Sequence, residues 1–198
     1  MNLKLASVNA INYACKKFHY SKRVPILGVS FNIYNKDGDW CGVIMYGYGA
    51  NKSLADNYNL WNGEVLELTR VALNGKQEYT SKALGLSLRL LKKYCPFLKM
   101  VVSYADIDQN HIGTIYQATN WDYLGERTKG QKVGYIINNK FVHNRSLNNK
   151  AKRSMAKKKG KEFITKGKRL YVYFLDRSLR TKYEKEFKKY CKNYAEEV

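Results

Sequence analysis

Residues 98–127, LKMVVSYADIDQNHIGTIYQATNWDYLGER, decide the fold that we expect for this chain. The apolar run at 100–102 is typical of a buried strand, and it leads to Ser103 and Asp106. A polar crossing then passes into a short segment that carries Tyr116. Because α/β folds place chemistry where a buried strand ends in a loop and a helix, this stretch is our candidate active site. Its spacing alone does not identify the reaction.

The composition indicates a folded protein with a polyanionic partner. A chain of 198 residues suits one α/β or α+β domain. It carries 36 Lys or Arg against 16 Asp or Glu, a net charge of +20, which favours DNA, RNA or an anionic membrane surface. The 17 tyrosines are interleaved with basic residues and Asn, which favours nucleic acid over membrane, although they also suit a core.

The cysteines and the N-terminus indicate a cytoplasmic protein. The four cysteines are irregularly spaced and form no CxxC pair, so we expect isolated thiols rather than a zinc ribbon or disulfides. Residues 1–17 contain no apolar run of signal-peptide length, and no stretch is long enough to span a bilayer. We therefore expect no membrane association.

The first 73 residues alternate between a helix and strands. A helix is predicted over 7–18, with Ser7 or Asn9 as its cap. A half-buried strand over 28–34 and a second strand over 40–48 flank an Asp-Gly turn, and residues 51–63 form a polar loop.

The next strand, predicted over 65–73, carries two charged residues in an apolar sequence. In a regular strand Glu67 and Arg70 face opposite sides, and a bulge between them would bring them to one side. They form either a plain ion pair or a phosphate contact by Arg70. A helix capped by Ser81 follows over 81–94.

The remaining chain is predicted to finish the sheet. We expect a helix over 114–119, a strand over 121–126 and a hairpin partner for it over 132–137. A last strand spans 171–175, and a closing amphipathic helix presents its apolar residues at spacings of four: Leu179, Tyr183, Phe187 and Cys191.

A basic segment lies between residues 150 and 169. Ten Lys or Arg stand there against the single acid Glu162, which on its own predicts a flexible, solvated run. Such charge density suits sequence-tolerant DNA contact. The residues that we expect to contact DNA are Lys150, Lys152, Arg153, Lys157, Lys158, Lys159, Lys168 and Arg169.

The predicted order of elements is that of the GNAT superfamily of acyltransferases, and five segments resemble the phage Mom family of DNA-modifying proteins. These segments are HYSKR (19–23), WCGVIMYG (40–47), ELTRVAL (67–73), SYADIDQNHIGTIYQATNWDYLGE (103–126) and RLYVYFLDRSLR (169–180).

The resemblance implies an α/β (α+β) fold, with a GNAT-like mixed central sheet and flanking helices in residues 1–137. Residues 138–198 are then a basic, DNA-contacting extension whose final strand and helix pack on the same domain. The implied enzyme is a transferase that adds a carbamoylmethyl group to the exocyclic amine of adenine in double-stranded phage DNA, which shields the DNA from host restriction. Because that amine is stacked and paired, the base must be flipped or the site opened. A homodimer remains open.

The resemblance and the local chemistry together nominate five catalytic residues. Asp106 orients or deprotonates the amine, or else caps the following turn. Tyr116 lies where GNAT enzymes often protonate the departing thiolate, although it is equally typical of a core. Ser103 is preferred over Tyr104 as the residue that faces the site, and His19 with Tyr20 lies where GNAT folds receive the acceptor.

The cofactor is implied by the fold and is not indicated by a motif. GNAT enzymes hold the pyrophosphate of acetyl-CoA or a related acyl donor in a glycine-rich loop, but here Gly75 and Gly85 are too far apart. Gly85, inside the predicted helix, is expected to permit close packing. The residues that remain as a phosphate seat are Arg70, Lys76, Ser81 and Lys82.

A metal and two other functions stay open. His19, His111 and Asp106 would form a two-His, one-carboxylate site for iron or another divalent metal if they converged. The same fold suits a GNAT-type N-acetyltransferase acting on RNA or protein amines. The basic segment and the tyrosines also suit a DNA-binding protein without catalysis.

Overall fold

The computed structural model describes residues 1–26, 28–49 and 53–187. The helices, 3-10 helices (η) and strands are, in chain order, β1 (Asn2–Leu5), α1 (Val8–Phe18), β2 (Ser30–Tyr34), β3 (Trp40–Gly47), η1 (Asp56–Tyr58), β4 (Val65–Leu73), α2 (Thr80–Tyr94), β5 (Met100–Asp106), η2 (Ile107–Gln109), α3 (Thr114–Gln117), β6 (Asp122–Arg127), β7 (Lys132–Ile137), β8 (Lys140–His143), η3 (Asn144–Ser146), α4 (Lys150–Lys159), β9 (Lys161–Ile164), β10 (Lys168–Phe174), α5 (Arg177–Tyr183) and η4 (Glu184–Glu186).

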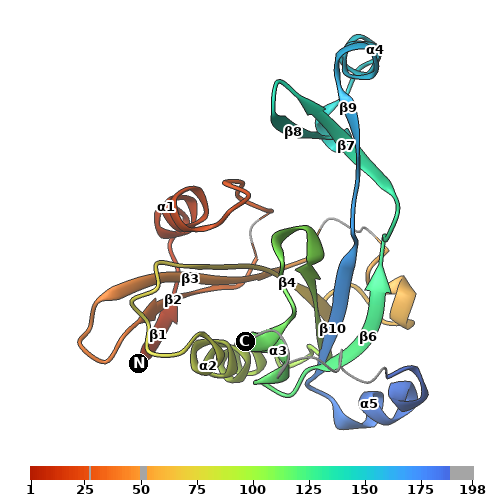
Figure 1. The fold of residues 1–198 in the computed structure, drawn as a ribbon. Coiled ribbons are helices and arrows are strands. Elements are labelled where there is room, and N and C mark those ends of the chain that lie inside the picture. The colour runs from red at the N-terminus through yellow and green to blue at the C-terminus, as the bar shows by residue number, and fades with distance from the viewer. Residues whose placement is uncertain (27, 50–52, 188–198) are drawn as a thin grey trace, which may run out of the picture. The chain divides into compact units, whose positions relative to one another are not determined.

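The chain divides into two compact units. The first comprises Met1–Tyr104, Gly113–Leu124 and Leu170–Val198, and the second comprises Ala105–Ile112 and Gly125–Arg169. A seven-stranded sheet has the order β1-β2-β3-β4-β5-β10-β6, and a three-stranded sheet in the second unit has the order β8-β7-β9 (Figure 1). The predicted mixed sheet with flanking helices is confirmed.

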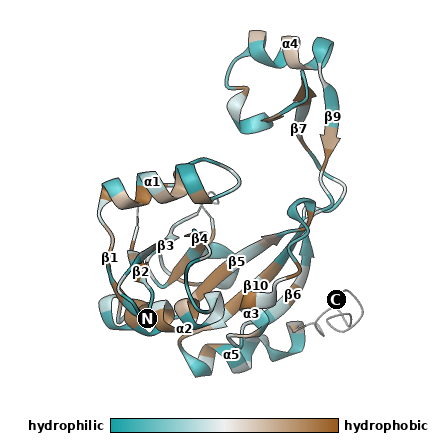
Figure 2. Cartoon of the chain, turned by 60° about the vertical axis from the view of Figure 1, so that its left-hand side comes forward, coloured by the Kyte–Doolittle hydropathy of each residue, from teal (hydrophilic) through white to brown (hydrophobic). Residues whose placement is uncertain are grey.

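The two faces of the large sheet are covered by different helices. Helix α1 packs on β3 through a buried cluster that includes Ile11, Cys15 and Met45. The next β3 residue, Tyr46, points the other way and bonds Ser87 of α2. Because successive strand residues face opposite sides, α1 and α2 lie on opposite faces. Figure 2 shows the hydrophobic residues concentrated on the strands between them.

The first helix agrees with its prediction, and the strand after it does not. The Ser7 side chain accepts the Ala10 N–H and caps α1. The strand at 30–34 is buried on both sides rather than half-buried, and β1, an additional strand, pairs along its edge. Asn32 is buried there, where it accepts the Trp40 indole N–H at 2.9 Å and donates to the Leu5 carbonyl.

Three further predictions need correction. Helix α2 begins at Thr80, so Ser81 lies inside its first turn and does not cap it. A Cβ added at Gly85 would meet only Thr119 Cγ2, at 4.0 Å, so packing does not require that glycine. Strand β7 pairs with β8 and β9 rather than with the strand at 122–127.

The basic run and the C-terminus also differ from expectation. The run folds into α4, which Asn149 caps by accepting the Lys152 N–H at 2.8 Å, and into β9. Its lysines are nevertheless mostly exposed, as predicted. The closing helix α5 ends at Tyr183, so Phe187 does not continue the predicted helical spacing of four residues. Cys191 lies outside the described residues. Among the described residues, no helix is long and apolar enough to cross a membrane.

Candidate functional site

Strands β4 and β5 separate in the middle of the large sheet. Their parallel pairing runs only from Val65↔Met100 to Glu67↔Val102, although both strands continue beyond these residues. At the point of separation the Ser103 hydroxyl lies 3.3 Å from the Leu68 carbonyl oxygen. Backbone groups that lack a neighbouring strand are available to an inserted ligand. The gap is therefore a place where this sheet can admit a ligand.

A bulge in β4 adjoins the gap. Met45 pairs with Arg70 and Tyr46 pairs with Leu68, so Thr69 is the extra residue. A bulge at this position brings Glu67 and Arg70 to one side of the strand, as predicted for that case. The Arg70 guanidinium donates to the carbonyls of Arg23 and Thr69.

Tyr116 lies under the gap in a hydrogen-bonded pair with Ser103. The two hydroxyl oxygens are 2.9 Å apart. The Tyr116 ring stacks on Tyr171 at 4.8 Å and contacts Trp121 edge-on. Gly113, just before α3, has φ +90°, and a Cβ there would collide with the Tyr171 hydroxyl. The backbone at Gly113 thus fixes the approach of α3 to Tyr171, and with it the position of Tyr116.

The environment of Tyr116 keeps its phenol protonated. Burial raises the pKa of Tyr116, the Ser103 hydrogen bond lowers it in part, and the negative charge of Glu67 raises it further. At neutral pH the phenol can therefore donate a proton and cannot act as a base. A second buried pair, Tyr46 with Ser87, has the same chemistry, and burial raises the pKa of Tyr46 as well.

Glu67 lies on the face of the sheet opposite to the Ser103–Tyr116 pair. It shares its side of β4 with Val65, because alternate strand residues face the same way. Its carboxylate lies directly against Gly49, in the space that a Cβ on that residue would occupy. Ser103 has the opposite parity from Val102, the residue that pairs with Glu67. The carboxylate and the Ser103–Tyr116 pair therefore flank the gap from opposite faces.

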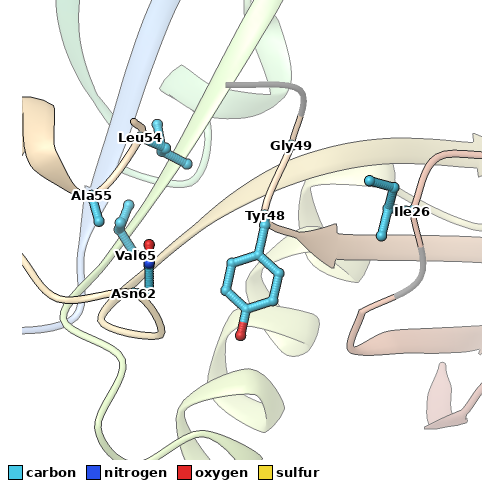
Figure 3. A pocket seen from close by; sticks show the side chains of 7 residues that line it. All are labelled: Ile26, Tyr48, Gly49, Leu54, Ala55, Asn62 and Val65. Carbon is cyan, nitrogen blue, oxygen red and sulfur yellow. The ribbon is translucent and has the colours of Figure 1, made fainter. Parts of the chain in front are cut away.

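A pocket of about 360 Å³ opens next to Gly49, the residue that the Glu67 carboxylate contacts (Figure 3). Its walls are mostly apolar, and the neighbouring Trp61 side chain is 81% exposed. The lining residues are Ile26, Tyr48, Gly49, Leu54, Ala55, Asn62 and Val65. In Figure 3 the Tyr48 side chain projects between Ile26 and the group formed by Leu54, Ala55 and Val65. The pocket has the size and lining that suit a flat organic molecule.

The predicted acceptor residues His19 and Tyr20 lie in the loop after α1. The His19 Nδ1 accepts the Ser21 N–H at 3.1 Å and lies 2.9 Å from the Ser21 hydroxyl oxygen. The His19 and Tyr20 rings are 4.3 Å apart, and Tyr20 is 49% exposed. One ring nitrogen of His19 is thus committed to the turn.

Asp106 and His111 belong to the second unit. An Asp106 carboxylate oxygen accepts the Asp108 N–H at 3.1 Å and caps η2, and the Asp106 carbonyl accepts the His111 N–H. In the described ranges no group of three or more His, Cys, Asp or Glu is placed to hold a metal ion. The metal site predicted from His19, His111 and Asp106 is therefore not assembled.

The predicted cofactor residues, apart from Arg70, surround the start of α2. The Tyr79 cap makes no side-chain capping bond, and no acid lies in the first turn. Ser81 and Lys82 lie in that turn, and Lys76 lies just before it, where its N–H donates to the Asn74 side chain. The amides at a helix start suit a pyrophosphate, so these residues fit an acyl donor of the coenzyme A type.

Six of the predicted DNA-contacting residues lie on α4, and Lys168 and Arg169 begin β10. Ala156 is the buried residue of α4, which leaves most of the helix surface to basic side chains. Arg153 also donates to the Leu147 carbonyl at 2.9 Å.

Neither the pocket nor the setting of Glu67 was predicted from the sequence. Ile26, Leu54 and Val65 have the composition of a core, so nothing in the sequence indicates a cavity. An acid inside an apolar strand was a usable signal for Glu67, but its nearness to Arg70 favoured an ion pair.

Comparisons with known proteins identify the family of the chain. A family model described as the Mom protein family matches residues 2–192. The methylcarbamoylase mom of Escherichia phage Mu is 26% identical over 135 residues, which is 66% of this chain and 54% of that protein. The chain thus spans about half the length of that relative.

Solved structures add the fold. A mutant of spermidine N-acetyltransferase from Vibrio cholerae superposes with a TM-score of 0.51 and 10% identity, over 90% of this chain and 99% of that one. Another mutant of the same enzyme gives 0.52 and 7%, over 89% and 97%. The predicted GNAT-like fold is confirmed.

Proposed function

The chain belongs to the Mom protein family, and from that membership we propose that it is a transferase that adds a carbamoylmethyl group to the exocyclic amine of adenine in phage DNA. The observation that carries the proposal is the pair of Glu67 and Tyr116 on opposite sides of the gap between β4 and β5. A carboxylate base and a protonated phenol are the groups that transfer to an amine requires. The product would shield the DNA from host restriction.

In the proposed mechanism the chain supplies positioning and proton transfer. When bound, a donor related to acetyl-CoA would supply a methylene carbon that carries both a carboxamide and a leaving group, because acetyl-CoA itself would leave an acetyl group. Glu67 takes the proton that the adenine nitrogen loses as its bond to the donor carbon forms. Tyr116 gives its proton to the leaving group as the old bond breaks, and Ser103 holds the phenol in place. Lys76, Ser81 and Lys82 at the start of α2 would hold the donor phosphates, whereas Arg70 lies on the Glu67 side of β4.

The pocket is the proposed seat of the adenine. A base stacked in a duplex cannot reach an amine-modifying site, so the adenine must be extruded. Tyr48 offers an aromatic surface, and the Asn62 amide has the paired donor and acceptor that recognise an adenine edge. His19 and Tyr20 would line its approach, and the basic residues of α4 would hold the DNA backbone.

The test is to express the chain in bacteria, digest the cellular DNA to nucleosides and search by mass spectrometry for a modified deoxyadenosine. We expect an adduct heavier by carbamoylmethyl, which is lost in Glu67→Gln. Unmodified DNA from folded, soluble wild-type protein would contradict the proposal.

Asp106 remains a proposed catalytic residue because it ends β5, three residues after Ser103. Asn can accept the same N–H, so Asp106→Asn keeps the cap and removes the charge. We expect less adduct at an unchanged melting temperature. An unchanged adduct yield would leave Asp106 with the cap alone.

A second candidate function is plain N-acetyl transfer to RNA or protein amines. The gap and the acid–base pair suit any amine acceptor, and this observation favours it. Acetylated RNA or protein in the same cells, with unmodified DNA, is the result that would select it.

A further inference from the structure

The small sheet of the second unit has one covered face and one open face. Helix α4 and the η3 turn cover the first face, where Tyr135, Leu147 and Ala156 are buried together. Tyr135 pairs with Val142 of β8, and these two residues therefore point toward the helix. The residues of β7 on either side of Tyr135 must point the other way.

The open face carries two phenylalanines that meet over a glycine. Gly134 pairs with Phe163, and Ile136 pairs with Phe141, so both aromatic residues lie on the face opposite α4. Their ring centroids are 4.9 Å apart, and Phe141 is 46% exposed. A Cβ on Gly134 would stand 2.7 Å from the Phe141 ring. The glycine therefore lets the Phe141 ring lie down on the sheet and form a flat surface.

Two further residues extend this aromatic surface. His143 pairs with Gly134 on the same face, and its ring centroid is 6.0 Å from that of Phe141. Lys161, which pairs with Ile136, places an exposed positive charge on the same face. We call Phe141, Phe163, His143 and Lys161 the platform.

The charge around the platform is strongly positive. Residues 125–169 contain 15 Lys or Arg and two acids, and residues 105–112 add two more acids. All four acids have partners in the unit: Glu126 pairs with Lys129, Glu162 with Lys132, the Asp108 carboxylate bonds Thr165, and the Asp106 carboxylate accepts the Asp108 N–H. The basic side chains thus outnumber the acids almost fourfold, as a polyanionic ligand requires.

We propose that the platform binds an unpaired stretch of DNA, with bases stacked on Phe141 and Phe163 and phosphates on the surrounding lysines. An open sheet face with paired aromatic rings and a basic surround is how proteins hold single strands without sequence preference. A duplex keeps its bases stacked on each other, so it can use the lysines but not the rings. This binding goes beyond adenine transfer, and it does not require that transfer occur.

The test measures binding to the full chain by fluorescence anisotropy. The probes are a labelled single-stranded oligothymidine and a labelled duplex, without any donor. We expect Phe141→Leu/Phe163→Leu to weaken binding of the single strand by about tenfold or more, because each stacked base contributes substantially to affinity. Duplex affinity and the dependence of affinity on salt should stay as in the wild type.

The matched control is Phe97→Leu, since Phe97 is 85% exposed and belongs to the first unit. It should leave affinity for both probes unchanged. Leucine keeps the apolar volume, and equal melting temperatures of all variants establish that the fold survives. As a second measurement, the single strand should quench the emission of the Phe141→Trp variant more than that of the wild type, and the duplex should quench both equally.

Two results would overturn the proposal. One is single-strand affinity that the double leucine variant leaves unchanged. The other is a wild type that sediments as a dimer and becomes a monomer in that variant, which would make the face a contact between two copies. Because adduct formation is measured separately by mass spectrometry, failure of the platform and failure of the proposed transferase give different results.

Discussion

Two buried tyrosines with the same partner type allow the Tyr116 hydroxyl to be tested against a control. Tyr116 bonds Ser103 at the gap, whereas Tyr46 bonds Ser87 under α2. We expect Tyr116→Phe to lower adduct formation by about 100-fold or more, as loss of a general acid does. Tyr46→Phe should retain it, although each variant loses about 1 kcal/mol of stability with its hydrogen bond. Equal activity of the two variants would remove Tyr116 from proton transfer.

The same two residues predict behaviour at alkaline pH. Burial raises the pKa of both phenols above the ordinary value near 10. Below pH 10 both phenols are protonated in the folded and the unfolded chain, so their full contribution to the free energy of unfolding is present. Above this pH the unfolded chain loses the protons first, so the free energy of unfolding must fall as pH rises, by up to about 1.4 kcal/mol per pH unit for each phenol. Urea unfolding at pH 8 and pH 10.5 should show a smaller fall in either Phe variant.

At the scale of elements, α2 contains a glycine that its packing does not need. Gly85 lies inside the helix, and a Cβ at this position would meet only Thr119 Cγ2, at 4.0 Å. Gly85→Ala should therefore stabilise the protein by about 0.5–1 kcal/mol in urea unfolding. Gly113→Ala is the contrasting variant, because its positive φ and the Tyr171 hydroxyl leave no room. Stabilisation by both substitutions would contradict this account.

Glu64 joins the starts of β4 and β5, at the paired end and not at the gap. Its carboxylate lies 2.6 Å from Lys99 Nζ and accepts the Trp61 N–H at 2.8 Å. The Lys99 contact and then the Trp61 hydrogen bond lower the pKa of Glu64. Because the pKa of Glu64 is lowered in the folded protein, the ionised carboxylate stabilises the fold above the ordinary value of 4.5. This stabilisation is lost as pH falls below that value. In Glu64→Gln the free energy of unfolding should fall less between pH 5 and pH 3 than in the wild type. An equal fall in the two proteins would exclude a stabilising role for the Glu64 carboxylate.

The elements that the sequence predicts are those whose signals are local. The cap at Ser7 and the apolar spacing of α1 are sufficient to predict that helix, and the apolar sequence of β4 is sufficient to predict that strand. Strand β1 and the burial of Asn32 depend on pairing between distant segments, which periodicity does not encode. Helix α4 was missed because repulsion between its lysines outweighs its propensity in a local view, whereas the Asn149 cap and packing through Ala156 stabilise it.

The candidate site was predictable to a similar extent. Ser103 and Tyr116 follow from strand, loop and helix order, and the structure brings them together at 2.9 Å. The gap depends on where two parallel strands stop pairing, and the pocket on a loop that folds over Val65. Neither leaves a mark on composition or spacing. Asp106 and His111 were grouped with His19 because side-chain type suggests ligands, but type does not indicate distance.

At the scale of the whole molecule, the net charge of +20 predicts salt-sensitive DNA binding. The slope of log affinity against log salt should be about −0.9 for each phosphate neutralised. Replacing Lys157, Lys158 and Lys159 of α4 with Gln should reduce that slope by up to about 0.9 per residue. The control replaces the exposed first-unit residues Lys16, Lys36 and Lys93 with Gln, which changes net charge equally. Equal slopes for the two triple variants would show that total charge, and not α4, determines binding.

The short pairing of β4 with β5 also has a consequence for deuterium uptake. Amides that face the gap have no strand partner there and should exchange with solvent rapidly in the free protein, while those in the Val65–Glu67 ladder exchange slowly. A molecule seated between the strands would cover the exchanging amides. Mass-resolved exchange over residues 68–73 and 103–106 would therefore reveal the donor by protection alone, before any product has formed.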